Sequence, residues 1–175
     1  FAIKPQVAKE VIIKYNEFSS KKNFIISIVA GKKINFFEKY LAKSHQIVRA
    51  MPNMPALVGK GMTCFIANNI TTNKNKNIAK NLFNKIGQSI WLKKELDIDK
   101  ITAISGSGPA YFFLFIDNLI SESIKLGIQS KIAKELVYQT AIGSIDLLIK
   151  GNSSALDLKN KIAVKGGTTE AAINI

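Results

Sequence analysis

The segment from Gly108 to Leu126 constrains the fold more than any other part of this sequence, because it is apolar on nearly every side. A helix with hydrophobic residues all round is buried on all sides in a folded protein. A fully buried helix is hard to cover within the helical second part of one chain, so we expect a partner subunit to complete its core. Its large hydrophobic residues are Phe112, Phe113, Leu114, Phe115, Ile116, Leu119, Ile120 and Ile124.

The sequence from Asp97 onward predicts helices only. A second long helix is expected over Lys131–Lys150, because a glycine follows it directly. Either Ser153 or Ser154 can cap a third, shorter helix that has Asp157 in its first turn. We therefore expect residues 98–175 to form an all-helical domain.

The first part of the chain, residues 1–97, alternates short apolar runs with helical patterns. Such alternation predicts an α/β domain with a parallel or mixed sheet. The run Phe24–Ala30 is continuously apolar and indicates a strand buried on both faces. Phe1–Lys4 is expected to be extended, and Met51–Pro55 is expected to be a turn. The further strands are expected over His45–Ala50, Met62–Ala67 and Ser89–Leu92. Helices are expected over Gln6–Phe18, Lys33–Ala42 and Asn73–Ile86.

The formal net charge of +13 first suggests a nucleic-acid-binding protein. However, 24 of the 25 basic residues are lysines spread along the chain, and Arg49 is the only arginine. Arginine is the usual bidentate ligand of phosphate and guanine, so the charge indicates a compositional bias and no nucleic-acid partner. One cysteine, Cys64, and one histidine, His45, argue against a disulfide scaffold and against a metal site.

No membrane segment or leader peptide is expected. The longest uncharged stretch, Ile101–Ile116, is shorter than the roughly 20 residues that span a bilayer, and Ser105–Pro109 interrupts it. The first residues lack the order of basic, apolar and small residues that marks a signal peptide. We therefore expect a soluble, cytoplasmic protein that has no membrane partner.

The strongest candidate for a binding site is the segment Lys165–Ile173, KGGTTEAAI. Its two glycines allow positive φ angles, Thr168 or Thr169 can cap the helix that follows, and Glu170 lies in its first turn. A turn of this kind at a helix N-terminus can bind a carboxylate or a phosphate. An ordinary capped helix after a turn remains the alternative.

The sequence suggests no catalytic acid or base. Ser105–Tyr111, SGSGPAY, opens a helix and has no third glycine at the dinucleotide spacing, so its small residues indicate close backbone packing. Cys64 lies within an apolar strand and reads as a core residue, and His45 precedes a strand and reads as structural or solvated. Without a paired-carboxylate site, the sequence favours a reaction driven by a cofactor.

Three segments, in order, resemble pyrroline-5-carboxylate reductases, the last enzymes of proline synthesis: Val48–Thr63, Ile101–Phe113 and Val164–Ile173. The opening FAIKPQ is similar to an element late in the family's nucleotide-binding domain. The resemblance implies a partial Rossmann-like fold followed by a helical dimerisation domain. It also implies that the chain lacks roughly the first third of a family member, including the glycine-rich loop, and further C-terminal helix, so that alone it would bind NADPH poorly.

The resemblance implies that NADPH or NADH binds at the carboxyl ends of the strands. The family pattern places the Lys4–Pro5 and Ala30–Gly31 turns there. Asn53 and its flanking prolines would line the nicotinamide side.

The resemblance further implies that the substrate carboxylate binds the backbone N–H groups around Gly166, Gly167 and Thr168. The hydroxyl that contacts the substrate nitrogen corresponds to Thr169. Where many members have a serine followed by proline or lysine, this chain has Val164 and Lys165, so a serine contact to the carboxylate is lost.

These residues together imply hydride transfer from NAD(P)H to the C=N carbon of 1-pyrroline-5-carboxylate, which gives L-proline in a dimer or larger homo-oligomer. A related imine or hydroxy-acid reductase of the same architecture is the nearest alternative, although the Gly-Gly-Thr-Thr segment argues against it. A lysine-rich nucleic-acid-binding protein is the alternative of another class. A non-catalytic dimerisation fragment is a third possibility.

Overall fold

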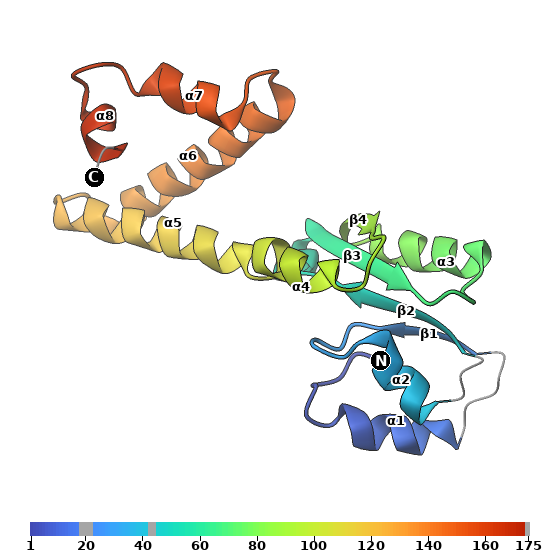
Figure 1. Ribbon diagram of the computed structural model, residues 1–175. Helices are drawn as coiled ribbons and strands as arrows, with labels where there is room; N and C mark the ends of the chain where they lie inside the picture. Colours follow the sequence, from blue (N-terminus) through green and yellow to red (C-terminus); the bar gives the residue numbers. More distant parts are fainter. Residues whose placement is uncertain (18–22, 42–44, 174–175) are drawn as a thin grey trace. The chain divides into compact units, whose positions relative to one another are not determined.

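The structure, a computed structural model, describes residues 1–17, 23–41 and 45–173 (Figure 1). The chain divides into two compact units, Phe1–Tyr111 and Phe112–Ile175. The first unit contains a sheet covered by helices, and the second unit contains helices only among its described residues. The predicted α/β part followed by an all-helical part is therefore confirmed.

A four-stranded mixed sheet forms the centre of the first unit, in the order β1 (Phe24–Ser27), β2 (Gln46–Met51), β3 (Gly61–Ala67) and β4 (Gly87–Trp91). The pairs β1–β2 and β3–β4 are parallel, whereas β2 and β3 are antiparallel. The predicted strands are all present, and the sheet is of the mixed kind.

Two clusters of buried residues cover the two faces of this sheet. On one face, α1 (Ala8–Asn16) and α2 (Ile34–Tyr40) pack their buried Ile12 and Phe37 against Ile25 and Ile47. On the other face, α3 (Asn73–Phe83) packs against Phe65 and its neighbours. Two ends of the predicted helices, Phe18 and Ala42, lie outside the described residues.

Strand β1 is shorter than predicted. It ends at Ser27, whose hydroxyl accepts a hydrogen bond from the backbone of Val29 at 3.2 Å, and a turn follows in which Gly31 has φ +69°. Burial along β1 alternates, and Ala30 is exposed, so the expectation of a strand buried on both faces over Phe24–Ala30 is wrong beyond Ser27. The Ser27 hydroxyl gives the Val29 N–H a local partner in place of a neighbouring strand.

Two short elements continue the first unit. The Met51–Pro55 segment, predicted as a turn, leads from β2 into the 3₁₀ helix η1 (Met54–Val58). After β4, helix α4 (Asp97–Ile101) runs into a π-helical turn, η2 (Thr102–Gly106), and then into α5 (Gly108–Lys125). As predicted, Pro109 lies in the first turn of that helix, where its missing N–H is tolerated.

The second unit consists of the rest of α5 with α6 (Ser130–Lys150), α7 (Ala155–Ile162) and α8 (Thr168–Ile173). Its small core contains Ile120, Ala133 and Val137. Of the two candidate serines, Ser154 caps α7, and it forms a capping box with Asp157.

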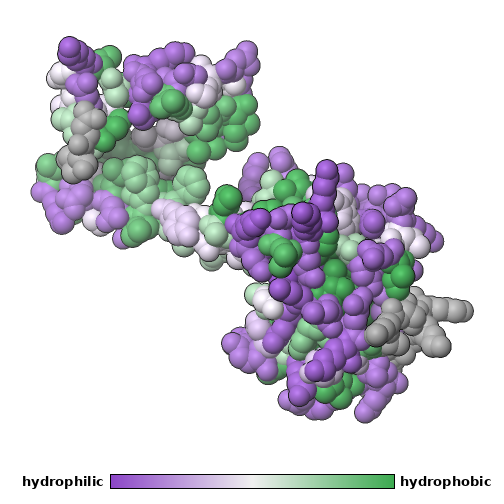
Figure 2. All heavy atoms as spheres, in the orientation of Figure 1, coloured by the Kyte–Doolittle hydropathy of each residue, from purple (hydrophilic) through white to green (hydrophobic). Residues whose placement is uncertain are grey.

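Much of the apolar surface of α5 and α6 remains exposed within the chain. Phe112, Phe113, Leu114 and Phe115 are 54–62% exposed. Figure 2 shows hydrophobic residues gathered over these helices. The helix is therefore not buried on all sides by this chain, which is the situation in which a second subunit was expected.

No described helix is both long and apolar enough to cross a lipid bilayer.

Candidate functional site

The residues expected to bind the cofactor follow strands that end at the same edge of the sheet. Since β1 and β2 are parallel, the segments that follow them leave the sheet on the same side. Phe1 lies beside β1 in the parallel sense, because its amino group donates to Ile26 O at 2.6 Å and its carbonyl accepts from Ile28 N at 3.0 Å. The structure thus brings the Lys4–Pro5 turn to this carboxyl edge, together with the segments that follow β1 and β2.

The turn after β1 leaves its backbone accessible. Ala30 and Gly31 are both exposed, and a Cβ placed on Gly31 would have no atom within 4 Å. Lys4 is exposed as well, and its carbonyl accepts a hydrogen bond from Val7 at the start of α1. An edge formed by the carboxyl ends of parallel strands is where open α/β sheets bind ligands, so these residues fit a nucleotide cofactor.

Asn53 lies at the same edge, and both ends of its amide are engaged. Its Oδ1 accepts from Met62 N at 2.8 Å, and its Nδ2 donates to Ser105 O at 3.0 Å. The amide therefore connects the end of β2 to β3 and to the π-helical turn η2. The sequence alone suggested no contact between Asn53 and Ser105, because 52 residues separate them.

The Gly-Gly-Thr-Thr turn lies in the second unit, before α8. Gly166 has φ +78°, and its N–H donates to the Glu170 carboxylate at 2.7 Å. The N–H of Gly167 donates to Val164 O at 3.0 Å, and a Cβ on Gly167 would lie 3.1 Å from that same oxygen. The turn thus needs small residues, and it holds one carboxylate of its own chain.

Neither threonine caps this helix, contrary to expectation. Helix α8 begins at Thr168, so Thr168 and Thr169 lie inside it and Gly167 precedes it. The Gly167 carbonyl accepts from Ala171 N at 3.3 Å, as the residue before a helix does. Glu170 lies in the first turn, as predicted, and the first N–H groups of an α-helix have no carbonyl partner within the helix itself.

The expected cofactor residues belong to the first unit, and Val164, Gly166, Gly167, Thr168 and Thr169 belong to the second.

Cys64 and His45 are core residues. Both side chains are fully buried, and burial raises the pKa of the Cys64 thiol, although a hydrogen bond to Ser105 opposes this effect. A thiol that stays protonated is a poor nucleophile. His45 Nδ1 lies 3.4 Å from Asn23 O, so of the two alternatives for His45 the structural one is confirmed. Among the described residues, no group of three His, Cys, Asp or Glu side chains could hold a metal ion.

The sequence did not predict one cluster of charged side chains, formed by Arg49, Glu95 and Asp99. Arg49 is 3% exposed in β2; its Nη1 lies 3.1 Å from Glu95 Oε1 and its Nη2 lies 3.6 Å from Asp99 Oδ1. The same Glu95 oxygen accepts from Ile34 N at 2.8 Å, so it also caps α2. A lone arginine within an apolar strand is a signal of such a pair, because a buried charge requires a partner.

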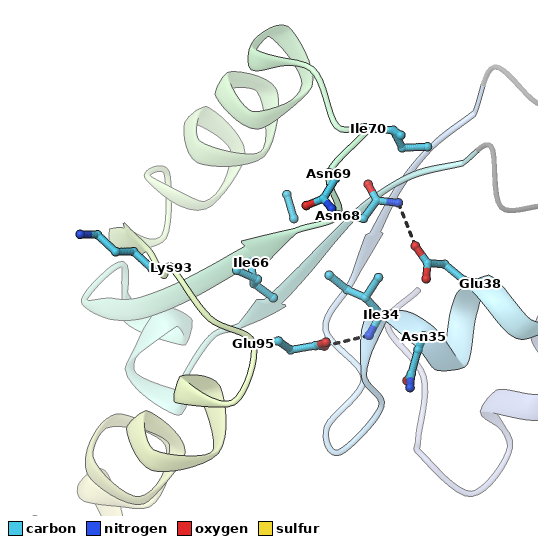
Figure 3. A pocket seen from close by; sticks show the side chains of 10 residues that line it. Ile34, Asn35, Glu38, Ile66, Asn68, Asn69, Ile70, Lys93 and Glu95 are labelled. Carbon is cyan, nitrogen blue, oxygen red and sulfur yellow. Dashed lines mark hydrogen bonds between the residues drawn. The ribbon is translucent and has the colours of Figure 1, made fainter.

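Glu95 also borders an open cavity of ≈ 420 Å³ in the first unit (Figure 3). On its opposite side Glu38 accepts from Asn68 Nδ2 at 3.3 Å. The carboxylates of this cavity are therefore held by their own chain. The lining residues are Ile34, Asn35, Glu38, Ile66, Ala67, Asn68, Asn69, Ile70, Lys93 and Glu95.

Comparison with known proteins identifies relatives of the whole chain. Residues 95–175 match the family model for pyrroline-5-carboxylate reductase dimerisation. The chain is 35% identical, over 99% of its length, to pyrroline-5-carboxylate reductase of Haemophilus influenzae, and it spans 65% of that protein. To the same-named protein of Pasteurella multocida it is also 35% identical, and it spans 64% of that protein.

Two solved structures match as well. Pyrroline carboxylate reductase of Plasmodium falciparum, solved with NADP bound, aligns with a TM-score of 0.92 at 35% identity, covering 98% of this chain and 68% of that one. The corresponding structure from Coxiella burnetii aligns with a TM-score of 0.85 at 36% identity, covering 98% of this chain and 64% of that one. Identity at this level extends over both units, from the sheet to the Gly-Gly-Thr-Thr turn. The chain therefore belongs to the pyrroline-5-carboxylate reductase family.

Proposed function

We propose that the protein reduces 1-pyrroline-5-carboxylate to L-proline with NADPH or NADH. The observation that carries the proposal is the 35% identity to curated relatives of that name over 99% of this chain. The coverage of those relatives is partial, so the activity of the whole protein is inferred from its family.

The cofactor is proposed to bind at the carboxyl edge of the sheet. Lys4, Pro5, Ala30 and Gly31 follow the parallel strands toward this edge, where Lys4, Ala30 and Gly31 are exposed, and Asn53 lies just beyond the end of β2. When bound there, the cofactor supplies the hydride that reduces the C=N carbon. The protein's own contribution is to position the reacting groups. Such positioning can lower the activation free energy of hydride transfer by roughly 7–11 kcal/mol in the best cases.

The substrate carboxylate is proposed to bind the turn of Gly166, Gly167 and Thr168. The hydrogen bond that Gly166 N donates to the Glu170 carboxylate supports this, because an N–H group of the turn is directed at a carboxylate oxygen. A bound substrate would replace Glu170 there or bind the N–H groups at the start of α8. Val164, whose carbonyl bonds to Gly167, would border the same turn.

Thr169 is the proposed catalytic residue. From its position two residues after Gly167, its hydroxyl would lie beside a carboxylate held in the turn, next to the ring nitrogen of the substrate. The hydroxyl would hydrogen-bond to that nitrogen. Because a protonated imine already carries the proton that the product amine needs, the reaction requires no strong acid from the protein.

A homo-oligomer is proposed to form through helices α5 and α6. A groove of ≈ 630 Å³ between these helices exposes large apolar side chains, which water would contact in an isolated chain. The matching dimerisation family model covers this region. Its start at residue 95 also supports a functional boundary between residues 97 and 98. A cytoplasmic location remains a prediction that cell fractionation would test.

An assay of the full-length protein tests the reaction directly. NADPH absorbance is followed with 1-pyrroline-5-carboxylate, and product is identified as L-proline by chromatography. NADH is tested in parallel. Saturable, substrate-dependent loss of NADPH or NADH with matching proline formation is expected, whereas a protein with no such activity would contradict the proposal.

A further inference from the structure

We infer that Asn53 is a positioning residue for hydride transfer, which it serves by holding the carbonyl of Ser105 against the carboxyl edge of the sheet. The inference rests on the proposed function, because the reaction whose geometry would be set is the proposed one. All of the contacts involved lie within the first unit.

The Ser105 carbonyl needs a partner because of Pro109. In an α-helix, this carbonyl would accept from the N–H four residues later, which is at position 109. Proline has no N–H, and the N–H of Ala110 is directed to Ser107 O at 2.9 Å. Asn53 Nδ2 therefore supplies, at 3.0 Å, a donor that the local backbone lacks.

The other end of the amide fixes Asn53 itself. In the register of β2 and β3, Met51 pairs with Cys64, so Asn53 stands opposite Met62 just beyond the end of β2. Its Oδ1 accepts from Met62 N at 2.8 Å. Since one partner is a donor and the other an acceptor, only one orientation of the amide satisfies both. With both ends committed, Asn53 acts on a bound cofactor through the backbone that it holds.

The segment that Asn53 holds is closely packed at this edge. A Cβ on Gly106 would lie 3.0 Å from Thr102 Cγ2 and 3.8 Å from Met51 Cε, so the turn lies against the end of β2. The π-helical hydrogen bond from Ser107 N to Thr102 O, 2.8 Å long, sets the path of the turn. Any shift of η2 would therefore change the shape of the proposed cofactor edge.

The test is the isosteric substitution Asn53→Asp in the full-length protein. Asp retains the acceptor for Met62 but presents an oxygen, and no donor, to Ser105 O. Because a misplacement of about 1 Å can lower a rate by about 100-fold, we expect kcat to fall by about 10- to 100-fold. The NADPH dissociation constant, measured by fluorescence, should change by less than about threefold, and the deuterium isotope effect with deuterated NADPH should rise, because hydride transfer becomes more rate-limiting.

Asn68→Asp is the matched control. The Asn68 amide also connects two backbone groups in the first unit: its Oδ1 accepts from Ile47 N at 3.1 Å, and its Nδ2 donates to His45 O at 2.9 Å. These groups lie at the beginning of β2, away from the carboxyl edge. The same Nδ2 donates to Glu38 Oε1 at 3.3 Å, so Asn68→Asp also brings two carboxylates together. We expect Asn68→Asp to lower the melting temperature and to leave kcat and the isotope effect near their original values.

Hydrogen exchange gives a readout that does not depend on activity. The amides of Gly106 and Ser107 should exchange faster in Asn53→Asp and not in Asn68→Asp. Inactivity of the unchanged protein would count against the proposed function alone. With an active protein, equal kcat in the two variants would overturn the inference, and so would a dissociation constant for NADPH weakened more than tenfold at unchanged kcat, because that result identifies a direct ligand.

Discussion

At the scale of single residues, the proposed chemistry depends most on Thr169. It lies in the first turn of α8, directly after the residues whose backbone forms the proposed carboxylate site. Because Gly167, and not Thr169, precedes the helix, the Thr169 hydroxyl is not needed as an N-cap. Its loss should therefore affect the reaction much more than the stability of the fold.

Thr169→Ala is expected to lower kcat/KM by about 10- to 150-fold in the full-length protein. The hydrogen bond that it removes, to a charged or basic nitrogen, is worth roughly 1.5–3 kcal/mol. Thr169→Ser should keep most of the activity, since the hydroxyl remains. Thr140→Ala, at an exposed position on α6, is the control. Normal kinetics with a lowered melting temperature for Thr169→Ala would assign Thr169 a purely structural role.

Asp157 offers a test of local electrostatics. The hydroxyl and the N–H of Ser154 donate to Asp157 Oδ2 at 2.6 and 3.1 Å, and these bonds lower the pKa of Asp157 below its ordinary value of 3.8. The ionised carboxylate thus stabilises the start of α7 above pH 3.8, and this stabilisation is lost as the pH falls through the lowered pKa.

The titration of Asp157, followed by carboxyl NMR shifts, should have its midpoint below 3.8. Ser154→Ala should raise that midpoint, because both the hydroxyl donor and the capping geometry are lost. Ser153→Ala should leave it unchanged, since Ser153 contacts Lys161 instead. A raised midpoint in the Ser153 variant alone would mean that the wrong serine has been assigned to the cap.

At the scale of elements, the Arg49–Glu95 pair connects three segments that are distant in the sequence. It connects strand β2 to the segment after β4, and Glu95 also caps α2. Glu95 is 25% exposed, so water stabilises its charge in part. The pair therefore determines where these elements meet more than it adds to the free energy of folding.

Arg49→Met should lower the free energy of unfolding by about 2–4 kcal/mol in a denaturant titration. This is somewhat less than the typical cost of breaking a fully buried pair, because the remaining Glu95 carboxylate is partly hydrated. Lys14→Met removes the exposed Glu10–Lys14 pair and should leave the transition midpoint unchanged. If both variants unfold at the same denaturant concentration, Arg49 has no special part in joining these elements.

At the scale of the whole molecule, a single chain leaves the apolar surfaces of α5 and α6 exposed to water. The small core of the second unit uses only a few of their hydrophobic residues. Obligate subunit interfaces are rich in large hydrophobic residues, as a protein core is, and this surface has the same composition.

Leu114→Glu should therefore shift the full-length protein toward monomer in analytical ultracentrifugation at micromolar concentration. Leu114 is 62% exposed within the chain, so the substitution removes little from the chain's own core, and it introduces a charge that the interface cannot hydrate. Lys159→Glu, at an exposed position of α7 outside the proposed interface, should leave the assembly intact. A native protein that is already a folded, active monomer would contradict the proposed assembly.

The sequence alone determined the elements and their order. Hydrophobic periodicity, glycines and prolines act over a few residues, so the four strands, the helical second part and the turn at Gly166–Gly167 could all be predicted. The three family segments further suggested the cofactor and substrate residues, which stay predictions. The expectation that Thr168 or Thr169 caps α8 was wrong, because both lie inside the helix.

Only the tertiary structure decided which distant groups meet. Val29 N bonds to the Ser27 hydroxyl just beyond β1, and the capping box identifies Ser154 rather than Ser153 as the cap. Glu95 lies 46 residues from its partner Arg49, and Ser105 lies 52 residues from its partner Asn53. Such pairs leave no periodic signal in a sequence, because a polar atom that loses water on folding can be satisfied by any group that the chain path brings near. Because Pro109 has no N–H to donate to the Ser105 carbonyl, the Asn53 side chain donates to it instead.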